Sequence, residues 1–140
     1  ITHYIQGMMV VNFNARGSVD WQASLALNQA PVNDEGASIG FISGMVRDRV
    51  AFIYNDHPGN LQISDPMKKL DMVKPDTKNS ATCLAYVDKY GKLDADLLWT
   101  DANEQGIILP HSAYPINRTQ VVALAHSAKG NYRLVKLTFY

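Results

Sequence analysis

Two short apolar runs constrain the fold of this chain more than any other feature. The first lies within residues 48–56 and the second within residues 119–127, and each ends in polar residues that favour turns. An almost unbroken apolar run of this length is typical of a β-strand that is buried on both faces. The side chains that we expect to be nearly inaccessible are Val50, Phe52, Val121 and Ala123.

Most of the remaining chain is also predicted to form short strands joined by turns, because helical periodicity is weak throughout. Residues 14–17 run from Asn to Gly between two apolar segments, which is a hairpin signal, and residues 88–91 repeat the pattern. The strands predicted in addition to the two apolar runs cover residues 8–13, 19–27, 38–45, 81–87, 93–100, 107–109 and 132–139.

The segment from His57 to Asn79 differs from the rest of the chain. It contains three prolines and a mixed-charge stretch, and proline at this density does not fit central strands. We interpret it as a solvated excursion between two sheet elements, with room for one short helical turn around residues 67–72.

The order of strands and turns repeats along the chain. Residues 13–20 align with 87–94, and residues 50–53 align with 121–124, which corresponds to about two repeats of roughly 70 residues. The predicted fold is all-β, with antiparallel sheets arranged as β-propeller-like blades; a β-sandwich is the alternative. Residues 1–140 form a single β-repeat region, with one repeat at about 8–56, a second at about 81–127, and a terminal strand at 132–139.

The phase of the repeat predicts incomplete sheets at both ends of the chain. If the buried run is the innermost strand, one four-stranded unit consists of residues 50–54, 81–87, 93–100 and 106–109. The chain also starts at Ile1 without Met, so we expect a removed leader or a longer parent protein. Unpaired strand edges are normally covered, so the expected partners are the remainder of the chain or partner subunits that complete the edge strands.

Several turn and strand signatures resemble a known group of proteins. They are Gly17-x-x-x-Trp21, the segment 54–61, Val87-Asp88-x-x-Gly91 and the closing strand 134–139. Together they resemble the C-terminal part of uncharacterised bacterial envelope proteins with β-propeller-like repeats. The resemblance implies an extracytoplasmic protein of the periplasm or cell surface, and it transfers no catalytic residue.

Charge and composition exclude some functions. Thirteen basic residues balance thirteen acidic ones, and no basic cluster is present, so we expect no nucleic-acid partner. No apolar run approaches the ~20 residues of a membrane-spanning helix, so this segment is not expected to insert into a membrane. The single cysteine, Cys83, lies in an apolar run and is interpreted as a small buried hydrophobe.

Candidate site residues are few, and each has a structural alternative. Tyr54, Asn55 and Asp56 could line a ligand site at the end of a strand, or the two polar residues could cap a local turn. Asp94 and Asp96 share one strand face, which suits either acid–base chemistry or a solvated edge.

Two further patterns concern metals. Residues 101–106 resemble the start of a calcium loop, but Ser112 stands where a bidentate Glu would be required, which favours a polar turn. The four histidines lack the spacing of metal ligands, and no cofactor is predicted. They are His3, His57, His111 and His126.

The function that these observations favour is a non-catalytic scaffold or interaction module within a bacterial envelope or cell-surface complex. The alternative is a propeller that binds carbohydrate or another ligand, including a glycan-active enzyme, since four aromatic rings could stack on sugars. These rings are Trp21, Tyr90, Trp99 and Tyr114. No catalytic residue is assigned.

Overall fold

The computed structural model describes residues 5–30, 34–63, 68–73, 79–99, 105–127 and 129–140. Within these ranges the regular structure is β-strand, apart from one short 3-10 helix. The elements are β1 (Ile5–Phe13), β2 (Val19–Gln29), β3 (Phe41–Val46), β4 (Arg49–Asp56), η1 (Pro58–Gln62), β5 (Ala81–Val87), β6 (Leu93–Trp99), β7 (Ile107–Asn117), β8 (Gln120–His126) and β9 (Tyr132–Thr138). No helix among the described residues is long and apolar enough to cross a membrane.

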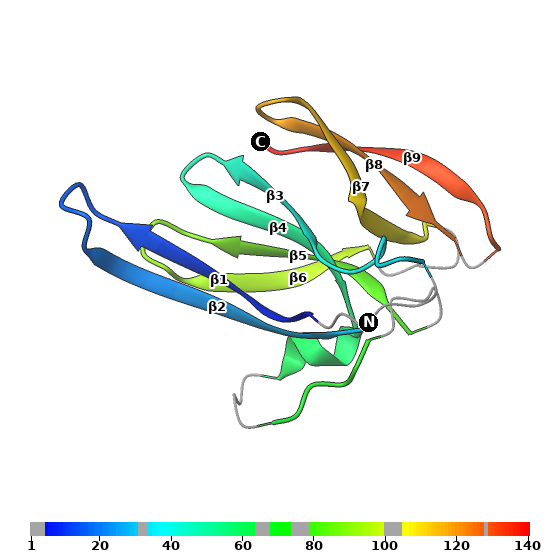
Figure 1. The fold of residues 1–140 in the computed structure, drawn as a ribbon, viewed down its shortest axis with the longest axis horizontal. Helices are drawn as coiled ribbons and strands as arrows, with labels where there is room; N and C mark the ends of the chain where they lie inside the picture. Colours follow the sequence, from blue (N-terminus) through cyan, green and yellow to red (C-terminus); the bar gives the residue numbers. More distant parts are fainter. Residues whose placement is uncertain (1–4, 31–33, 64–67, 74–78, 100–104, 128) are drawn as a thin grey trace.

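The strands form three antiparallel sheets. Sheet A has the order β1-β2, sheet B the order β3-β4-β5-β6, and sheet C the order β7-β8-β9. Figure 1 shows them as successive layers, from sheet A in blue through sheet B in cyan and green to sheet C in yellow and red. This arrangement confirms the all-β antiparallel prediction, and its face-to-face sheets are sandwich-like.

Two hydrophobic clusters hold the layers together, and β4 contributes to both. Phe52 and Tyr54 belong to the cluster between sheets A and B, whereas Ala51 and Ile53 belong to the cluster between sheets B and C. Successive side chains of a strand point to opposite faces, so β4 is buried on both sides, as predicted from its apolar run. The same prediction is wrong for β8, whose outer face carries the exposed Leu124 because no described strand covers that side of sheet C.

The burial prediction holds for three of the four named side chains. Phe52, Val121 and Ala123 are buried. Val50 is only half-buried, which corrects the prediction. It is the second residue of β4, directly after the β3–β4 turn, where the strand reaches the end of sheet B.

The pairing of strands differs from the predicted four-stranded unit. Residues 107–109 do not complete sheet B; they begin β7, which pairs with β8, and β3 is the fourth strand of sheet B. The apolar runs β4 and β8 are therefore second strands of their sheets rather than innermost ones. A tight β3–β4 connection between Val46 and Arg49 pairs these neighbours directly.

Several strand boundaries also differ, and β1 begins at Ile5 instead of residue 8. Strand β3 begins at Phe41 instead of residue 38. Strand β7 continues to Asn117 through Pro110 and Pro115. These prolines are tolerated because β7 is an edge strand of sheet C, where a missing N–H need not break a ladder.

The two predicted hairpin turns are present and use the same hydrogen bonds. In the β1–β2 turn, the Asn14 Oδ1 atom accepts from the Arg16 and Ser18 N–H groups at 2.9 and 3.1 Å. In the β5–β6 turn, the Asp88 Oδ1 atom accepts from Tyr90 and Lys92 at 2.8 and 2.9 Å. Each turn therefore closes around one polar side chain.

The proline-rich excursion is partly tied to the fold. Its regular structure is η1, whereas residues 68–72 are not helical; Met67 lies outside the described residues. Val73 is buried, its N–H donates to the Asn28 carbonyl at 2.8 Å, and its carbonyl accepts from Ala30 at 2.9 Å. The excursion thus returns to the end of β2 instead of staying in solvent.

Candidate functional site

Asn55, at the end of β4, is the centre of a buried polar network. Its Nδ2 atom donates to the carbonyl of Ser38 at 2.8 Å and to that of Ile108 at 2.7 Å. Its Oδ1 atom accepts from the Thr82 hydroxyl at 3.1 Å. The Thr82 oxygen in turn accepts from the Ile108 N–H at 3.2 Å, so the network joins sheet B to β7 of sheet C.

Gln29 extends this network to sheet A. Its Nε2 atom donates to the Asn55 carbonyl at 2.6 Å, and its Oε1 atom accepts from the Gly40 N–H at 2.9 Å. Gln29, Asn55 and Thr82 are fully buried. Asn55 was predicted to lie at a ligand site or to cap a local turn. Its side chain instead bonds the distant backbone of Ser38 and Ile108, and with the bond from Gln29 to its carbonyl the network connects all three sheets.

Asp56 makes the local contacts that a capping residue makes. Its Oδ1 atom accepts from the His57 N–H and from the Asn60 Nδ2 atom, both at 2.7 Å. Asn60 also exchanges hydrogen bonds of 3.0 Å with the backbone of Asp71, which ties η1 to the returning excursion. Burial raises the pKa of Asp56, and the hydrogen bonds from Asn60 and His57 partly offset that rise.

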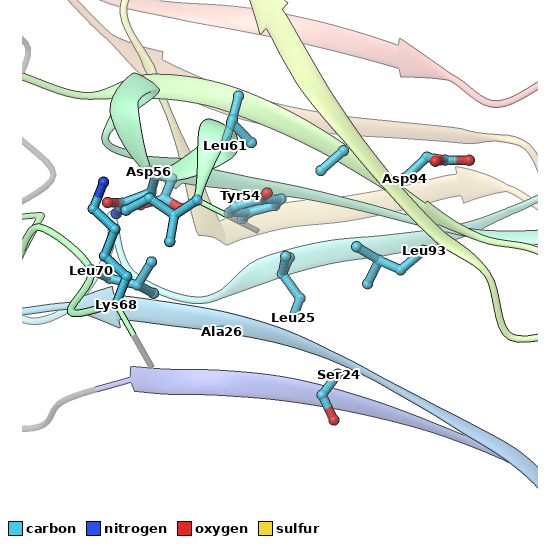
Figure 2. A pocket seen from close by; sticks show the side chains of 13 residues that line it. Ser24, Leu25, Ala26, Tyr54, Asp56, Leu61, Lys68, Leu70, Leu93 and Asp94 are labelled. Atoms are coloured by element: carbon cyan, nitrogen blue, oxygen red, sulfur yellow. The ribbon is translucent and has the colours of Figure 1, made fainter. Parts of the chain in front are cut away.

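A cavity of about 380 Å³ lies between sheets A and B, beside η1. Figure 2 shows Leu25 from β2 and Leu93 from β6 on its walls, with Tyr54 and Asp56 projecting from β4. Lys68 and Asp94 also border it. The cavity therefore brings Tyr54, Asp56 and Asp94, three of the candidates from sequence, around one space.

The Tyr54 hydroxyl is the one buried side-chain polar atom without a hydrogen-bond partner among the described residues. Burial, together with the nearby Cys83 and Asp56, raises the pKa of Tyr54, so its phenol stays protonated. A protonated phenol can donate one hydrogen bond. It cannot act as a base at neutral pH, so this geometry offers binding rather than proton abstraction.

Cys83 lies close to this cavity but is chemically inert. It is fully buried, and burial, with a smaller effect of Asp56, raises the pKa of its thiol to about 12. The thiolate is the nucleophile in cysteine chemistry, so a thiol with this pKa does not serve as one. The interpretation of Cys83 as a buried hydrophobe is confirmed.

The carboxylates of β6 lie on the other face of sheet B. Asp94 and Asp96 pair across the strands with Tyr86 and Leu84, whose side chains pack on the cluster between sheets B and C. Both aspartates are exposed, and the Asp94 Oδ2 atom lies 3.3 Å from the Lys92 Nζ atom. The predicted shared face of the two aspartates is thus the face toward sheet C. Asp94 borders the cavity between sheets A and B from β6, but its carboxylate belongs to the opposite face of the sheet.

The described histidines lie in three different places. His57 precedes η1, and its Nδ1 atom accepts from the Gly59 N–H at 3.1 Å. His126 stacks on Tyr132 with ring centroids 4.6 Å apart. His111 is exposed on β7, and His3 lies outside the described residues. No group of His, Cys, Asp or Glu suited to a metal occurs in the part of the chain that the structure covers.

The four aromatic rings proposed for sugar stacking do not share one surface. The Trp21 Nε1 atom donates to the Lys89 carbonyl at 2.8 Å, and the Trp99 Nε1 atom donates to the Gly106 carbonyl at 2.7 Å. Both indoles thus make contacts within the fold. Tyr90 and Tyr114 are exposed, one on the β5–β6 turn and the other on β7.

Residues 101–104 of the calcium-like loop lie outside the described residues. Beyond them, Gly106 adopts a left-handed conformation with φ of 77°. The Ser112 hydroxyl, at the position where a calcium loop needs its last ligand, donates to the Leu109 carbonyl at 2.6 Å.

The outer faces of sheets A and C carry exposed apolar side chains that were not predicted from the sequence. On sheet A, Met9 and Phe13 are 64% and 61% exposed. On sheet C, Leu134 and Tyr114 are each 71% exposed, and Leu134 pairs with Leu124. The sequences of β1 and β9 could have indicated these faces, since apolar residues occur at both odd and even positions and therefore lie on both sides of each strand.

No family model matches the chain, and neither the curated proteins nor the solved structures compared with it contain a match.

Proposed function

We propose that this chain is a non-catalytic scaffold or interaction module of a bacterial envelope or cell-surface complex. The observation that carries the proposal is the exposure of large apolar side chains on both ends of the stack of sheets, represented by Phe13 on sheet A and Leu134 on sheet C. Contiguous apolar surface of this kind marks an interaction site more often than a free surface.

We further propose that the three sheets are consecutive blades of a β-propeller-like repeat region. The recurrence of one turn design supports this: the β1–β2 and β5–β6 turns each close around an Asn or Asp oxygen and carry a left-handed Gly. The turns between β3 and β4 and between β7 and β8 also occupy matching positions before the two apolar runs. In a propeller each blade packs face to face on the next, which would cover both outer faces.

The chemistry of the described residues supports a non-catalytic role. The thiol of Cys83 is buried, the phenol of Tyr54 is protonated, and the Oδ1 atom of Asp56 is engaged by two donors. An acid–base or nucleophilic mechanism needs a reactive group that faces a substrate within hydrogen-bond reach of its partner. The exposed faces of sheets A and C are better explained by packing against partner sheets.

Size-exclusion chromatography with light scattering tests the proposed role of the outer faces. Leu134→Glu places a charge on the outer face of sheet C and should weaken self-association or partner binding by about tenfold or more, without lowering Tm. Lys136→Gln, on the same exposed face of β9, is the matched control and should leave association unchanged. Equal association of both variants and the parent protein would contradict the proposal.

A ligand-binding propeller is the second candidate, and the cavity beside Tyr54 is the observation that favours it. A glycan array together with a hydrolase screen on the intact protein separates the two functions. Specific glycan binding or turnover that is lost in Tyr54→Phe would replace the scaffold assignment, because this variant removes only the unpartnered hydroxyl.

A further inference from the structure

Sheet B has one strand more than sheet C. If β7, β8 and β9 correspond to β3, β4 and β5, sheet C has no counterpart of β6 among the described residues. Sheet B ends in β5 and β6, whereas sheet C ends in β9, and no described strand pairs with the other edge of β9. The position beside β9 that corresponds to β6 is therefore open among the described residues. A free edge of this kind presents backbone N–H and C=O groups that another strand can pair with.

An apolar groove lies at this open position. It has a volume of about 320 Å³ and lies between the last strands of sheet B and the inner side of β9. Leu84, Tyr86, Leu98 and Trp99 line it from β5 and β6, and all four are half-buried. Val135 and Leu137 line it from β9. A strand added to β9 would cover these side chains with every second residue.

The charges beside the groove restrict what the added strand can be. Asp94 and Asp96 lie on the face of β6 that carries the groove, because they pair with Tyr86 and Leu84. Both are exposed, and the Lys92 Nζ atom lies 3.3 Å from the Asp94 Oδ2 atom. Arg47 and Arg49, with Asp48, line the adjoining hollow at the β3–β4 turn, so the two carboxylates mark the β6 side of the groove as its acidic side. A strand that crosses this face therefore gains from a Lys or Arg side chain opposite the two carboxylates.

We propose that the free edge of β9 and this groove receive an extended strand of a partner polypeptide, with apolar side chains at alternate positions and a basic residue opposite Asp94 and Asp96. This inference rests on the proposed role as an interaction module and names the chemistry of the partner. Main-chain hydrogen bonds to β9 provide affinity, and the groove and the two carboxylates select the side chains.

Fusion of a donor strand to the C-terminus tests the proposal. The added segment is an Asn-Gly turn and about eight residues in which valine and leucine alternate with threonine. Its first groove-facing residue is lysine, because Tyr86, which lines a hollow with Tyr140, pairs with Asp94 on β6. Arg47, Asp48 and Arg49 line that hollow at the β3–β4 turn, so the lysine is placed to face β6 and not this turn. A matched control carries proline at two alternate positions of the strand.

The expected result is that the fused strand slows amide hydrogen exchange of β9 by about tenfold or more and shows strand chemical shifts by NMR. The proline control should leave β9 exchange as it is in the parent protein. Replacing the fused lysine by glutamate should reduce the protection, and Asp94→Lys together with Asp96→Lys should restore it.

A fused segment that stays unstructured, with β9 exchange unchanged, would overturn the docking of a strand. Slow amide exchange of β9 in the proline control would also overturn it. The same holds if the lysine-to-glutamate change leaves the exchange of β9 unaltered. The proposed function is tested separately, by the association of the outer-face variants. If Leu134→Glu weakens association but the fused strand does not protect β9, the chain is an interaction module and only the strand-docking inference is wrong.

Discussion

At the scale of single residues, buried polar side chains organise this protein. Asn55 satisfies two backbone carbonyls and the Thr82 hydroxyl in a fully buried site. Buried polar groups are costly when one partner is removed, because the remaining groups lose hydrogen bonds that water cannot replace.

Asn55→Ala should lower the free energy of unfolding by about 3 kcal/mol, since the Ser38 and Ile108 carbonyls lose their shared donor. Urea denaturation followed by tryptophan fluorescence measures the change. Gln22→Ala, on the exposed face of β2, is the control and should change stability by less than about 0.5 kcal/mol. Equal stability of the two variants would show that the network does not join the sheets.

Asp56 should make stability depend on pH. Burial raises its pKa in the folded protein above 3.8, so folding favours the protonated carboxyl. Its stabilising contribution is therefore fully present below pH 3.8 and is lost as pH rises through the raised pKa.

Asp56→Asn removes this titration, so the stability of the variant relative to the parent protein should increase as pH rises through that window. Urea unfolding of both proteins at a series of pH values measures the difference, in which the other titrating groups cancel. If the difference in unfolding free energy between the two proteins is the same at every pH, the raised pKa assigned to Asp56 is wrong.

At the scale of elements, β4 is the strand on which both hydrophobic clusters depend. Phe52 is buried against sheet A, and its ring meets that of Phe41 edge-on with centroids 5.5 Å apart. The neighbouring residue Ile53 packs on the opposite cluster. A charge on β4 therefore has no route to solvent on either face.

Phe52→Asp should destabilise the protein by about 4 kcal/mol, because it buries an unpaired carboxylate and leaves a cavity. Phe13→Asp makes the same chemical change at a side chain that is 61% exposed on β1 and serves as the control. Thermal unfolding decides the question: a Phe52→Asp variant that melts with its parent would show that β4 is not the buried strand.

The two equivalent hairpin turns provide a comparison within one molecule. Gly17 and Gly91 have φ values of 79° and 81°, so alanine costs about 1 kcal/mol of backbone strain at either position. A methyl group at Gly17 meets nothing within 4 Å, whereas one at Gly91 would lie 2.9 Å from the Trp21 ring. That ring is held by its hydrogen bond to Lys89.

Gly91→Ala should therefore destabilise the protein by about 1 kcal/mol more than Gly17→Ala does, because Trp21 must move as well. Chemical denaturation of the two single variants gives the difference directly. Equal losses would mean that Trp21 does not brace the β5–β6 turn against sheet A.

Strand positions could be predicted from the sequence because short apolar runs bounded by turn residues are a local signal. The predicted strand at residues 81–87 is identical to β5. The extent of β7 could not be predicted, since Pro110 and Pro115 argue against a strand unless it is known to lie at an edge. The pairing of β7 with β8 depends on tertiary contacts that local patterns do not contain.

The candidate site was predicted in part. Tyr54 and Asp56 do line one cavity with Asp94, and Asp56 does cap its own turn. The role of Asn55 could not be seen, because its carbonyl partners lie 17 and 53 residues away in the sequence. Gln29 was missed for the same reason: a glutamine at the end of a strand looks like any solvated polar residue.

At the scale of the whole molecule, the three sheets form a stack whose two ends differ. Sheet A presents Met9 and Phe13, and sheet C presents Tyr114 and Leu134. Two different apolar faces suit contacts with different partners, or a head-to-tail contact between copies, rather than a symmetric dimer. With a formal net charge of zero, the protein also lacks strong electrostatic repulsion between copies.

Sedimentation velocity of residues 1–140 over a range of concentrations tests most directly whether the outer faces of sheets A and C bind partners. Because both outer faces of the stack expose large apolar side chains, we expect species heavier than the 15.5 kDa chain, in amounts that increase with concentration. A single compact monomer at every concentration would contradict this prediction and would mean that the exposed apolar faces do not bind partners.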